Sequence, residues 1–216
     1  MISTIIFDFD GVILESVTIK TEAFRVLFSD VPEHVDEIVQ FHRDNGGMSR
    51  FDKIRYIYKN ILKKDLDQVT FETLSEKFSN LVFHGVLNAP FVPGAAEFLK
   101  KYSSTIPLYV VSATPEKELR EIMLERNLTP FFKEVYGAPR KKNDCIDEIL
   151  SKSGVPASDV LFVGDALNDL AAAQASGVAF IGRVGRGEND IFRNYSGVKT
   201  VITDLNELPL ILERPL

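Results

Sequence analysis

Two carboxylates follow the first apolar run of the sequence. Asp8 and Asp10 come directly after Thr4–Phe7, with Phe9 between them and Gly11 behind. In an open α/β sheet the ligand binds beyond the carboxyl ends of the strands, so an acid in this place can act as a nucleophile or move a proton. A simpler alternative, which these residues alone leave open, is a pair of acids that cap a following helix.

A second group of acids follows another apolar run far along the chain. Asp165 and Asp169 come after Val160–Val163 and Gly164, with Asn168 between them. If the two runs are strands of one sheet, three or four carboxyl groups meet at one edge and repel one another unless a cation neutralises them. Oxygen ligands without histidine or cysteine favour Mg²⁺. The pattern therefore predicts a magnesium site formed by two strand ends.

Residues suited to holding an anion lie near two further strand ends. Ser112 follows the apolar run Leu108–Val111 and offers a hydroxyl group, next to the backbone N–H groups of Ala113 and its neighbours. Lys141 and Lys142 start a helical pattern, whose N-terminus adds a partial positive charge. These groups supply locally the positive charge that a chain with a formal net charge of −6 lacks overall. With the acids, they predict one nucleophile, one metal site and one phosphate-binding site.

Short apolar runs alternate with helical patterns through most of the chain. The runs are continuously apolar, which is typical of strands buried on both faces of a parallel sheet. Alternation of this length indicates right-handed βαβ units, so we predict an α/β fold with a doubly wound, mostly parallel sheet. The expected strands are Thr4–Phe7, Leu108–Val111, Glu134–Tyr136, Val160–Val163, Val178–Ile181 and Thr200–Ile202. The expected helices between them include Glu116–Arg126, Asp144–Lys152 and Asp169–Ala175. Thr114 and Pro115 are expected to be the N-cap and the first residue of the first of these helices.

Residues 17–88 break this alternation because they contain no β-rich run. We predict a small all-helical cap domain at 17–88 and a Rossmann-like core formed by 1–16 and 89–216. The helix-like stretches of the cap are Val17–Phe28, Pro32–Arg43, Arg50–Leu62 and Phe71–Phe83. A short last helix is expected within Asp204–Leu216.

The order of these motifs resembles that of the haloacid dehalogenase-like (HAD) superfamily. Its members carry DxD after the first strand, Ser or Thr after the second, Lys at a later helix start and GDxxxD after the fourth strand. The helical insert stands where the phosphoglycolate phosphatase and β-phosphoglucomutase-like subgroup has its cap, so the resemblance covers the whole chain. In this sequence the motifs read Asp8-Phe9-Asp10, Ser112, Lys142 or Lys141, and Gly164-Asp165 to Asp169.

The resemblance implies a phosphatase that forms a covalent aspartyl-phosphate. Asp8 would attack phosphorus, and Asp10 would protonate the leaving oxygen and later take a proton from the hydrolytic water. Mg²⁺ would be bound by the carboxylates of Asp8 and Asp165 and by the backbone carbonyl of Asp10, with Asp169 acting through water or by orienting its neighbours. The implied catalytic residues are Asp8, Asp10, Ser112 and Lys142, and the implied metal residues are Asp8, Asp10, Asp165 and Asp169.

The second acid of the first motif favours phosphoryl transfer. Dehalogenases of the superfamily lack an acid at the position of Asp10, because a departing halide needs no proton. A phosphomutase of the β-phosphoglucomutase type stays an alternative, although those enzymes carry a histidine where this chain has Lys20. A non-catalytic phospho-signalling domain is a second alternative. Response-regulator receivers, however, are shorter, lack a helical insert and place aspartate after a central strand, where this chain has Ser112 and Gly137.

Residues of the predicted cap are candidates for choosing the substrate. Asn45–Arg50 is a glycine-containing turn at the place of the family's specificity loop, and Arg50 could bind a second anionic group or a sugar hydroxyl, or simply face water. Lys20 could reach the site from the hinge side or stay solvated. The candidate substrate-binding residues are Ala113, Arg50, Lys20 and Asn168. The cap type implies a sugar phosphate or a phosphorylated small acid as substrate. Arg183 and Arg186 are expected at the surface.

Composition narrows the classes of partner. No run of five or more Lys/Arg occurs and no apolar run is long enough for a membrane span, so neither nucleic acid nor membrane is expected as a partner. The single cysteine, Cys145, excludes an intrachain disulfide, and His34, His42 and His84 lack metal-ligand spacing. The N-terminal residues lack the basic and apolar regions of a signal peptide, so we expect a cytoplasmic location. The expected partner is a small phosphorylated metabolite, and the oligomeric state stays open.

Overall fold

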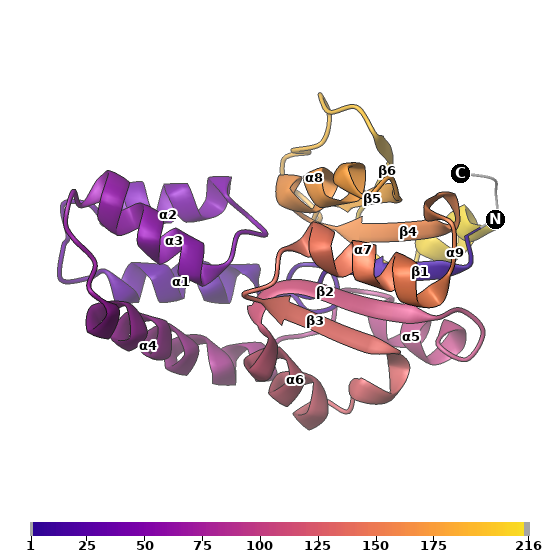
Figure 1. Cartoon of the computed structure of the whole chain (residues 1–216), viewed down its shortest axis with the longest axis horizontal. Coiled ribbons are helices and arrows are strands. Elements are labelled where there is room, and N and C mark those ends of the chain that lie inside the picture. Colours follow the sequence, from indigo (N-terminus) through magenta and orange to yellow (C-terminus); the bar gives the residue numbers. More distant parts are fainter. Residues whose placement is uncertain (1, 214–216) are drawn as a thin grey trace.

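One sheet of parallel strands forms the centre of the larger part of the molecule (Figure 1). The computed structural model describes residues 2–213. Within them the sheet has six strands in the order β3-β2-β1-β4-β5-β6, and every neighbouring pair is parallel. The strands are β1 (Thr4–Phe7), β2 (Leu108–Pro115), β3 (Glu134–Ala138), β4 (Val160–Gly164), β5 (Ala179–Arg183) and β6 (Val198–Ile202).

β1 lies between β2 and β4, at the point where the strand order reverses. The chain builds one half of the sheet outward through β2 and β3, then crosses to β4 and builds the other half. Phe7 of β1 is paired with Val110 of β2 and with Val163 of β4. Ligands of such sheets bind in the crevice at the reversal, beyond the carboxyl ends of the strands. The residues that follow β1 and β4 are therefore brought to the place where a ligand site is expected.

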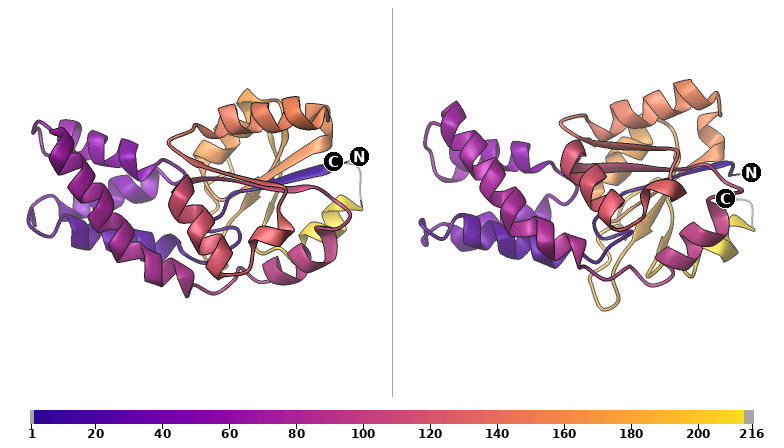
Figure 2. Two further views of the ribbon diagram at one scale, coloured as in Figure 1. Left: turned by 60° about the horizontal axis from the view of Figure 1, so that its bottom comes forward. Right: turned by 90° about the horizontal axis from the view of Figure 1, so that it is seen from below.

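Helices cover both faces of the sheet (Figure 2). They are α5 (Ala95–Tyr102), α6 (Glu116–Glu125), α7 (Lys142–Ser153), α8 (Leu167–Ala175) and α9 (Leu208–Leu212), with short 3₁₀ turns at Thr129–Phe131 and Ala157–Asp159. Phe7 and Val163 point to one face and pack with α5, α6 and α9. Ile6 and Phe162 point to the other face and pack with α7 and α8. The strands are apolar throughout because both faces are covered, and the predicted doubly wound sheet is confirmed.

A bundle of helices inserted between β1 and β2 lies beside the sheet (Figure 1). Its members are α1 (Val17–Leu27), α2 (Val35–Asp44), α3 (Arg50–Tyr56), which continues into a π-helical turn at Ile57–Ile61, and α4 (Gln68–Leu87). Phe24 of α1 packs on Phe78 of α4 with ring centroids 4.6 Å apart. Ser49 and Asp67 cap α3 and α4, because each side chain accepts a hydrogen bond from the backbone N–H three residues later.

Two chain segments join the bundle to the sheet, and they run side by side. The N–H of Glu15 donates to the carbonyl of Pro90 at 2.9 Å, and the N–H of Val92 donates to the carbonyl of Ile13 at 3.0 Å. The bundle begins with α1 and ends with α4, which is where the predicted boundaries of the cap fall. That the two parts behave as separate domains stays a prediction.

The structure contains the six predicted strands, but several helices begin or end at other residues than predicted. β2 runs on to Pro115, so Thr114 is a strand residue and its prediction as a helix N-cap is wrong. α4 extends past both ends of the predicted stretch Phe71–Phe83. The last helix covers Leu208–Leu212, and residues 214–216 of its predicted range lie outside the described residues. No helix in the described part of the chain combines the length and apolarity needed to cross a bilayer. The cytoplasmic location stays a prediction.

Candidate active site

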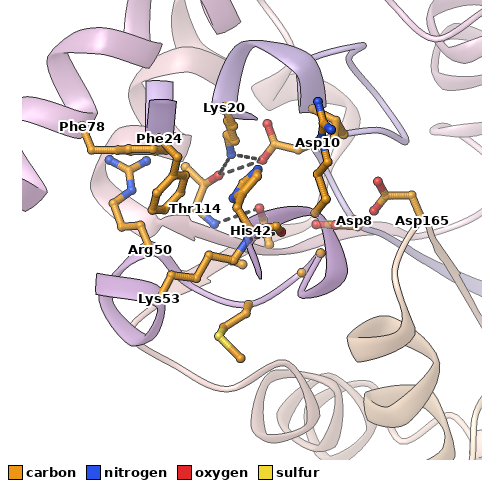
Figure 3. Close-up of a pocket in the computed structure, with 17 residues that line it drawn as sticks. Asp8, Asp10, Lys20, Phe24, His42, Arg50, Lys53, Phe78, Thr114 and Asp165 are labelled. Carbon is orange, nitrogen blue, oxygen red and sulfur yellow. Dashed lines mark hydrogen bonds and ion pairs between the residues drawn. The ribbon is translucent and has the colours of Figure 1, made fainter. Parts of the chain in front are cut away.

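Three carboxylates from two strand ends meet where the strand order reverses. Asp8 directly follows β1, and its backbone N–H donates to the carbonyl of Val163 in β4 at 2.9 Å. Carboxylate oxygens of Asp8, Asp165 and Asp169 all lie within 4.8 Å of one another. Gly11 permits this approach, because its φ is +76° and a Cβ there would lie 2.2 Å from Oδ2 of Asp165. Figure 3 shows Asp8 and Asp165 at one side of a pocket.

A buried lysine completes this cluster. Lys142 is the first residue of α7, and its Nζ lies 3.0 Å from Oδ2 of Asp8 and 2.5 Å from Oδ1 of Asp169. The other oxygen of Asp169 accepts a hydrogen bond from the N–H of Ala166 at 3.0 Å, so Asp169 is held on both sides and keeps Lys142 against Asp8. Lys141 is exposed. Of the two lysines that the sequence left open, the structure brings Lys142 to the cluster.

The cluster carries more negative than positive charge. Burial raises the pKa of Asp8 to about 7 despite the ammonium of Lys142. Burial and the carboxylate of Asp8 raise the pKa of Asp165 well above its usual range. Burial alone would lower the pKa of Lys142, but the carboxylates of Asp169 and Asp8 raise it. A divalent cation among these oxygens would relieve the repulsion, and a donor set made of oxygen suits Mg²⁺. The residues present therefore fit the predicted magnesium site.

The carboxylate of Asp10 belongs to a different hydrogen-bond network (Figure 3). It accepts hydrogen bonds from Oγ of Ser16 at 2.6 Å and from Oγ1 of Thr114 at 2.8 Å, and it pairs with Nζ of Lys20. Lys20 also donates to Oγ1 of Thr114 at 2.7 Å. Burial alone would raise the pKa of Asp10, but the charge of Lys20 and these hydrogen bonds lower it overall. The predicted metal contact of Asp10 therefore depends on its backbone carbonyl.

Ser16 and Thr114 are site residues that the sequence analysis missed. Thr114 lies two residues after Ser112 in β2, and alternate residues of a strand share a face, so this spacing is the signal that could have found it. Ser112 is buried, and its Oγ accepts a hydrogen bond from the N–H of Thr114 at 3.1 Å. The end of β2 thus supplies one hydroxyl beside Asp10 and another beside the place expected for phosphate.

The bundle and the sheet enclose a cavity of about 100 Å³ next to Asp8. Pockets for drug-sized ligands begin at about 300 Å³, so this cavity fits only a small molecule. Its walls include Asp8, Ser112, Ala113 and Thr114 from the sheet and Lys20, Phe24, Arg50 and Lys53 from the bundle.

Arg50 and Asn168, two of the predicted substrate contacts, already have protein partners. Arg50 is 4% exposed and donates to both carboxylate oxygens of Glu118 in α6, at 2.5 and 2.9 Å, and to Oγ of Ser79 at 2.6 Å. The interpretation that Arg50 faces water is therefore wrong, because α4 and α6 cover it. Glu118 also neutralises its charge. Asn168 is exposed and donates to the carbonyl of Gly46 at 3.0 Å, so it links α8 to the loop before α3.

Lys53 and His42 line the same cavity and were absent from the predicted site. Lys53 is 3% exposed, and its Nζ lies 2.9 Å from Nδ1 of His42 and 3.1 Å from the carbonyl oxygen of His42. Burial and the charge of Lys20 lower the pKa of Lys53 to about 7. Burial and Lys53 lower the pKa of His42 to about 3, so its ring is neutral near pH 7. Lys53 follows Arg50 by three residues and shares its helix face, but the sequence did not show that this face is turned inward.

Arg183 is a second basic residue whose position the sequence analysis misjudged. It is 6% exposed, so the surface position expected for it is wrong. Its guanidinium lies 2.5 Å from Oε1 of Glu15 and donates to the carbonyl of Gly11 at 3.1 Å. Arg183 thereby ties the end of β5 to the turn after β1. Arg186 is exposed, as predicted.

Comparisons with known proteins agree with this arrangement. Residues 5–183 match the family model described as haloacid dehalogenase-like hydrolase. A phosphoglycolate phosphatase of Aliivibrio fischeri is 30% identical over 186 residues, which cover 82% of this chain and 81% of that protein. The crystal structure of a hydrolase from Pseudomonas syringae superposes with a TM-score of 0.79 at 20% identity, covering 99% of this chain and 100% of that one. A predicted phosphoglycolate phosphatase from Haemophilus somnus superposes with a TM-score of 0.77 at 20% identity, covering 98% of both chains.

Proposed function

We propose that this chain cleaves a small phosphate monoester by forming an aspartyl-phosphate on Asp8. The chain belongs to the haloacid dehalogenase-like hydrolase family and is a phosphoric monoester hydrolase. The observation that carries this proposal is the position of the Asp8 carboxylate. It lies within 4.8 Å of the carboxylates of Asp165 and Asp169, with the ammonium of Lys142 at 3.0 Å.

In the first step an oxygen of Asp8 attacks phosphorus. A bond forms between this oxygen and phosphorus while the ester P–O bond breaks, and Asp10 gives its proton to the departing alkoxide. Lys142 and Ser112 are placed to hold the remaining phosphate oxygens as the charge moves. A phosphate dianion beside Asp10 raises the pKa of that carboxyl group, which prepares it to carry the proton.

In the second step water replaces Asp8 on phosphorus. The bond between phosphorus and the Asp8 oxygen breaks, inorganic phosphate leaves, and the proton of the water passes to Asp10. The hydrogen bonds from Ser16, Thr114 and Lys20 orient the Asp10 carboxylate and favour its ionised form. This form is the one that can act as a base.

Magnesium is the cofactor that this donor set supports best. When bound, it supplies positive charge that offsets the repulsion between the phosphate and the carboxylates. Asp8 and Asp165 would hold it directly, together with the backbone carbonyl of Asp10. Asp169 would act through water, because Lys142 and the N–H of Ala166 already occupy its two oxygens.

A phosphorylated small acid is the substrate class that we favour over a sugar phosphate. The relatives that carry the name phosphoglycolate phosphatase point to this class, and the cavity of about 100 Å³ suits a short chain. Substrate would enter when the cap, 17–88, moves away from the core at the paired connections near Glu15 and Pro90.

The experiment that tests the proposal measures phosphate release from 2-phosphoglycolate with and without Mg²⁺. We expect steady turnover that EDTA stops and Mg²⁺ restores. The variant Asp8→Asn should lose turnover, and no phosphoenzyme should form on it. The control variant Asp147→Asn changes an exposed acid of α7 and should behave as wild type. Full activity in Asp8→Asn would assign the nucleophile to another residue. Transfer of the phosphoryl group from Asp8 to an added sugar phosphate, rather than to water, would favour the phosphomutase alternative.

A further inference from the structure

Lys53 is a buried ammonium group whose contacts are neutral. Its Nζ lies against the ring nitrogen and the carbonyl oxygen of His42. Across residues 2–213, no carboxylate forms an ion pair with Lys53. The other cations near the cavity differ, because Lys20 pairs with Asp10, Arg50 with Glu118, and Lys142 with Asp8 and Asp169.

Such a group lowers the stability of the folded protein, so its presence calls for a reason other than stability. Burial of a charge without a partner of opposite sign disfavours the charged form. This accounts for the low pKa of Lys53, about 7, to which the nearby charge of Lys20 also contributes. A methionine would fill the same space beside Phe24 without this cost. A purely structural reason for the lysine would be its hydrogen bond to the end of α2, and the test below separates this reason from a binding role.

The position of Lys53 indicates what it could bind. It lies on the bundle side of the cavity, and Asp8 lies on the opposite side (Figure 3). Ser112 of β2 also lines this cavity. Arg50 precedes it by one helical turn and cannot offer a free positive charge, because Glu118 neutralises its guanidinium. The bundle wall thus offers, at Lys53, one buried positive charge that forms no ion pair with a carboxylate of residues 2–213.

We propose that Lys53 binds a carboxylate of the substrate and thereby selects short phosphorylated carboxylic acids. This inference rests on the proposed function, which places the phosphate at Asp8. One substrate would then contact the core through its phosphate and the cap through its carboxylate. A second phosphate group fits less well, because it would bring about two negative charges to a single ammonium group in a cavity of about 100 Å³.

The test compares two substrates that differ in the carboxylate. 2-Phosphoglycolate carries it, and ethyl phosphate has nearly the same length without it. We expect wild type to prefer 2-phosphoglycolate in kcat/KM. Lys53→Met should lower kcat/KM for 2-phosphoglycolate by about 10- to 100-fold, chiefly through KM, and leave ethyl phosphate within about threefold. Lys59→Met removes the same charge from an exposed position of the cap and should change neither substrate. Lys53→Arg should keep part of the preference.

Other outcomes would overturn the inference. Equal losses on the two substrates in Lys53→Met would leave Lys53 a structural residue, and equal kcat/KM values in wild type would show that no carboxylate is recognised, even if Lys53→Met failed to fold. Binding to Asp8→Asn, measured by calorimetry with Mg²⁺, separates this inference from the proposed function. If wild type released no phosphate, the proposed function would fail. Tighter binding of 2-phosphoglycolate than of ethyl phosphate, lost in Asp8→Asn/Lys53→Met, would still support the role of Lys53.

Discussion

At the scale of single residues, the basic side chains near the cavity differ mainly in their partners. Lys142 and Lys20 each face a carboxylate of the proposed mechanism, so their charges hold catalytic groups in place. Arg50 faces Glu118, and this pair joins α3 of the cap to α6 of the core. Lys53 faces the neutral His42. The cations that face a carboxylate therefore organise the site. Lys53, which faces a neutral group, is the residue that we expect to bind substrate.

Lys53 should impose a pH dependence on substrate preference. Its pKa of about 7 means that it loses its proton, and with it the charge that attracts a carboxylate, as the pH rises through this value. The ratio of kcat/KM for 2-phosphoglycolate to that for ethyl phosphate should therefore fall between about pH 6 and pH 9, because the ionisation of the phosphate and of the catalytic acids affects both substrates alike. In Lys53→Met the ratio should stay flat.

The groups that face Lys53 do not reverse this expectation. On the bundle they are His42, which is neutral in this range, and Lys20, and across the cavity they are Asp10, Asp165 and Lys142. A ratio that rises with pH in wild type would contradict the assignment.

At the scale of elements, the turn after β1 decides how closely the two strand ends approach. The chain reverses between Phe9 and Leu14, and the N–H of Leu14 donates to the carbonyl of Phe9 at 3.1 Å. Gly11 adopts positive φ within this turn. The same turn receives the guanidinium of Arg183 from β5. Residues from β1, β4 and β5 thus meet in one turn that has no room for a side chain at position 11.

We expect Gly11→Ala to damage the site more than it damages the backbone. The new Cβ would lie 2.2 Å from Oδ2 of Asp165, so the carboxylate must move. Gly154→Ala is the matched control, because Gly154 also has positive φ, +67°, but nothing lies within 4 Å of its Cβ position. Both variants should lose about 1 kcal/mol of stability from the strained backbone. Only Gly11→Ala should also lose Mg²⁺ affinity, measured by titration. Equal Mg²⁺ affinity in the two variants would show that Asp165 can shift without consequence.

At the scale of the whole molecule, the helical bundle closes the crevice that the sheet opens. The sheet places Asp8, Asp165 and Asp169 at the reversal of strand order, and the bundle brings Lys20 and Lys53 to the same cavity. The bundle is attached by two adjacent segments, so we predict that it can move relative to the sheet without breaking strand pairing. We expect this motion to open the cavity for substrate and to close it for chemistry.

Magnesium should stabilise the whole protein against heat. An ion that binds the folded state in about 100-fold excess over its Kd adds about 2.7 kcal/mol, which raises the Tm of a protein of this size by about 5–10 °C. We expect this shift in wild type and in Asp147→Asn, measured by thermal unfolding with Mg²⁺ and with EDTA. Asp165→Asn should lose most of it. An unchanged shift in Asp165→Asn would place the ion elsewhere.

The parallel sheet and the acids at its edge could be predicted because both depend on local pattern. Continuous apolar runs identify buried strands, and each acid of the cluster follows such a run. Ser112 and the pair Lys141 and Lys142 were predicted in the same way, from their positions after a strand and at a helix start, and the structure brings Lys142 of this pair to the cluster. Thr114 was misjudged because proline after threonine is also typical of a helix start, whereas pairing with β3 extends β2 through Pro115.

The sequence alone determined which residues stand at strand ends, because a strand and the acid that follows it are neighbours in the chain. Tertiary structure alone decided which charges are paired. Arg50 meets Glu118 and Arg183 meets Glu15 across 68 and 168 positions of the chain, and no local pattern encodes such a contact. The role proposed for Lys53 depended on tertiary structure most of all. Its ammonium group becomes a candidate binding group only because the bundle and the sheet together remove it from water.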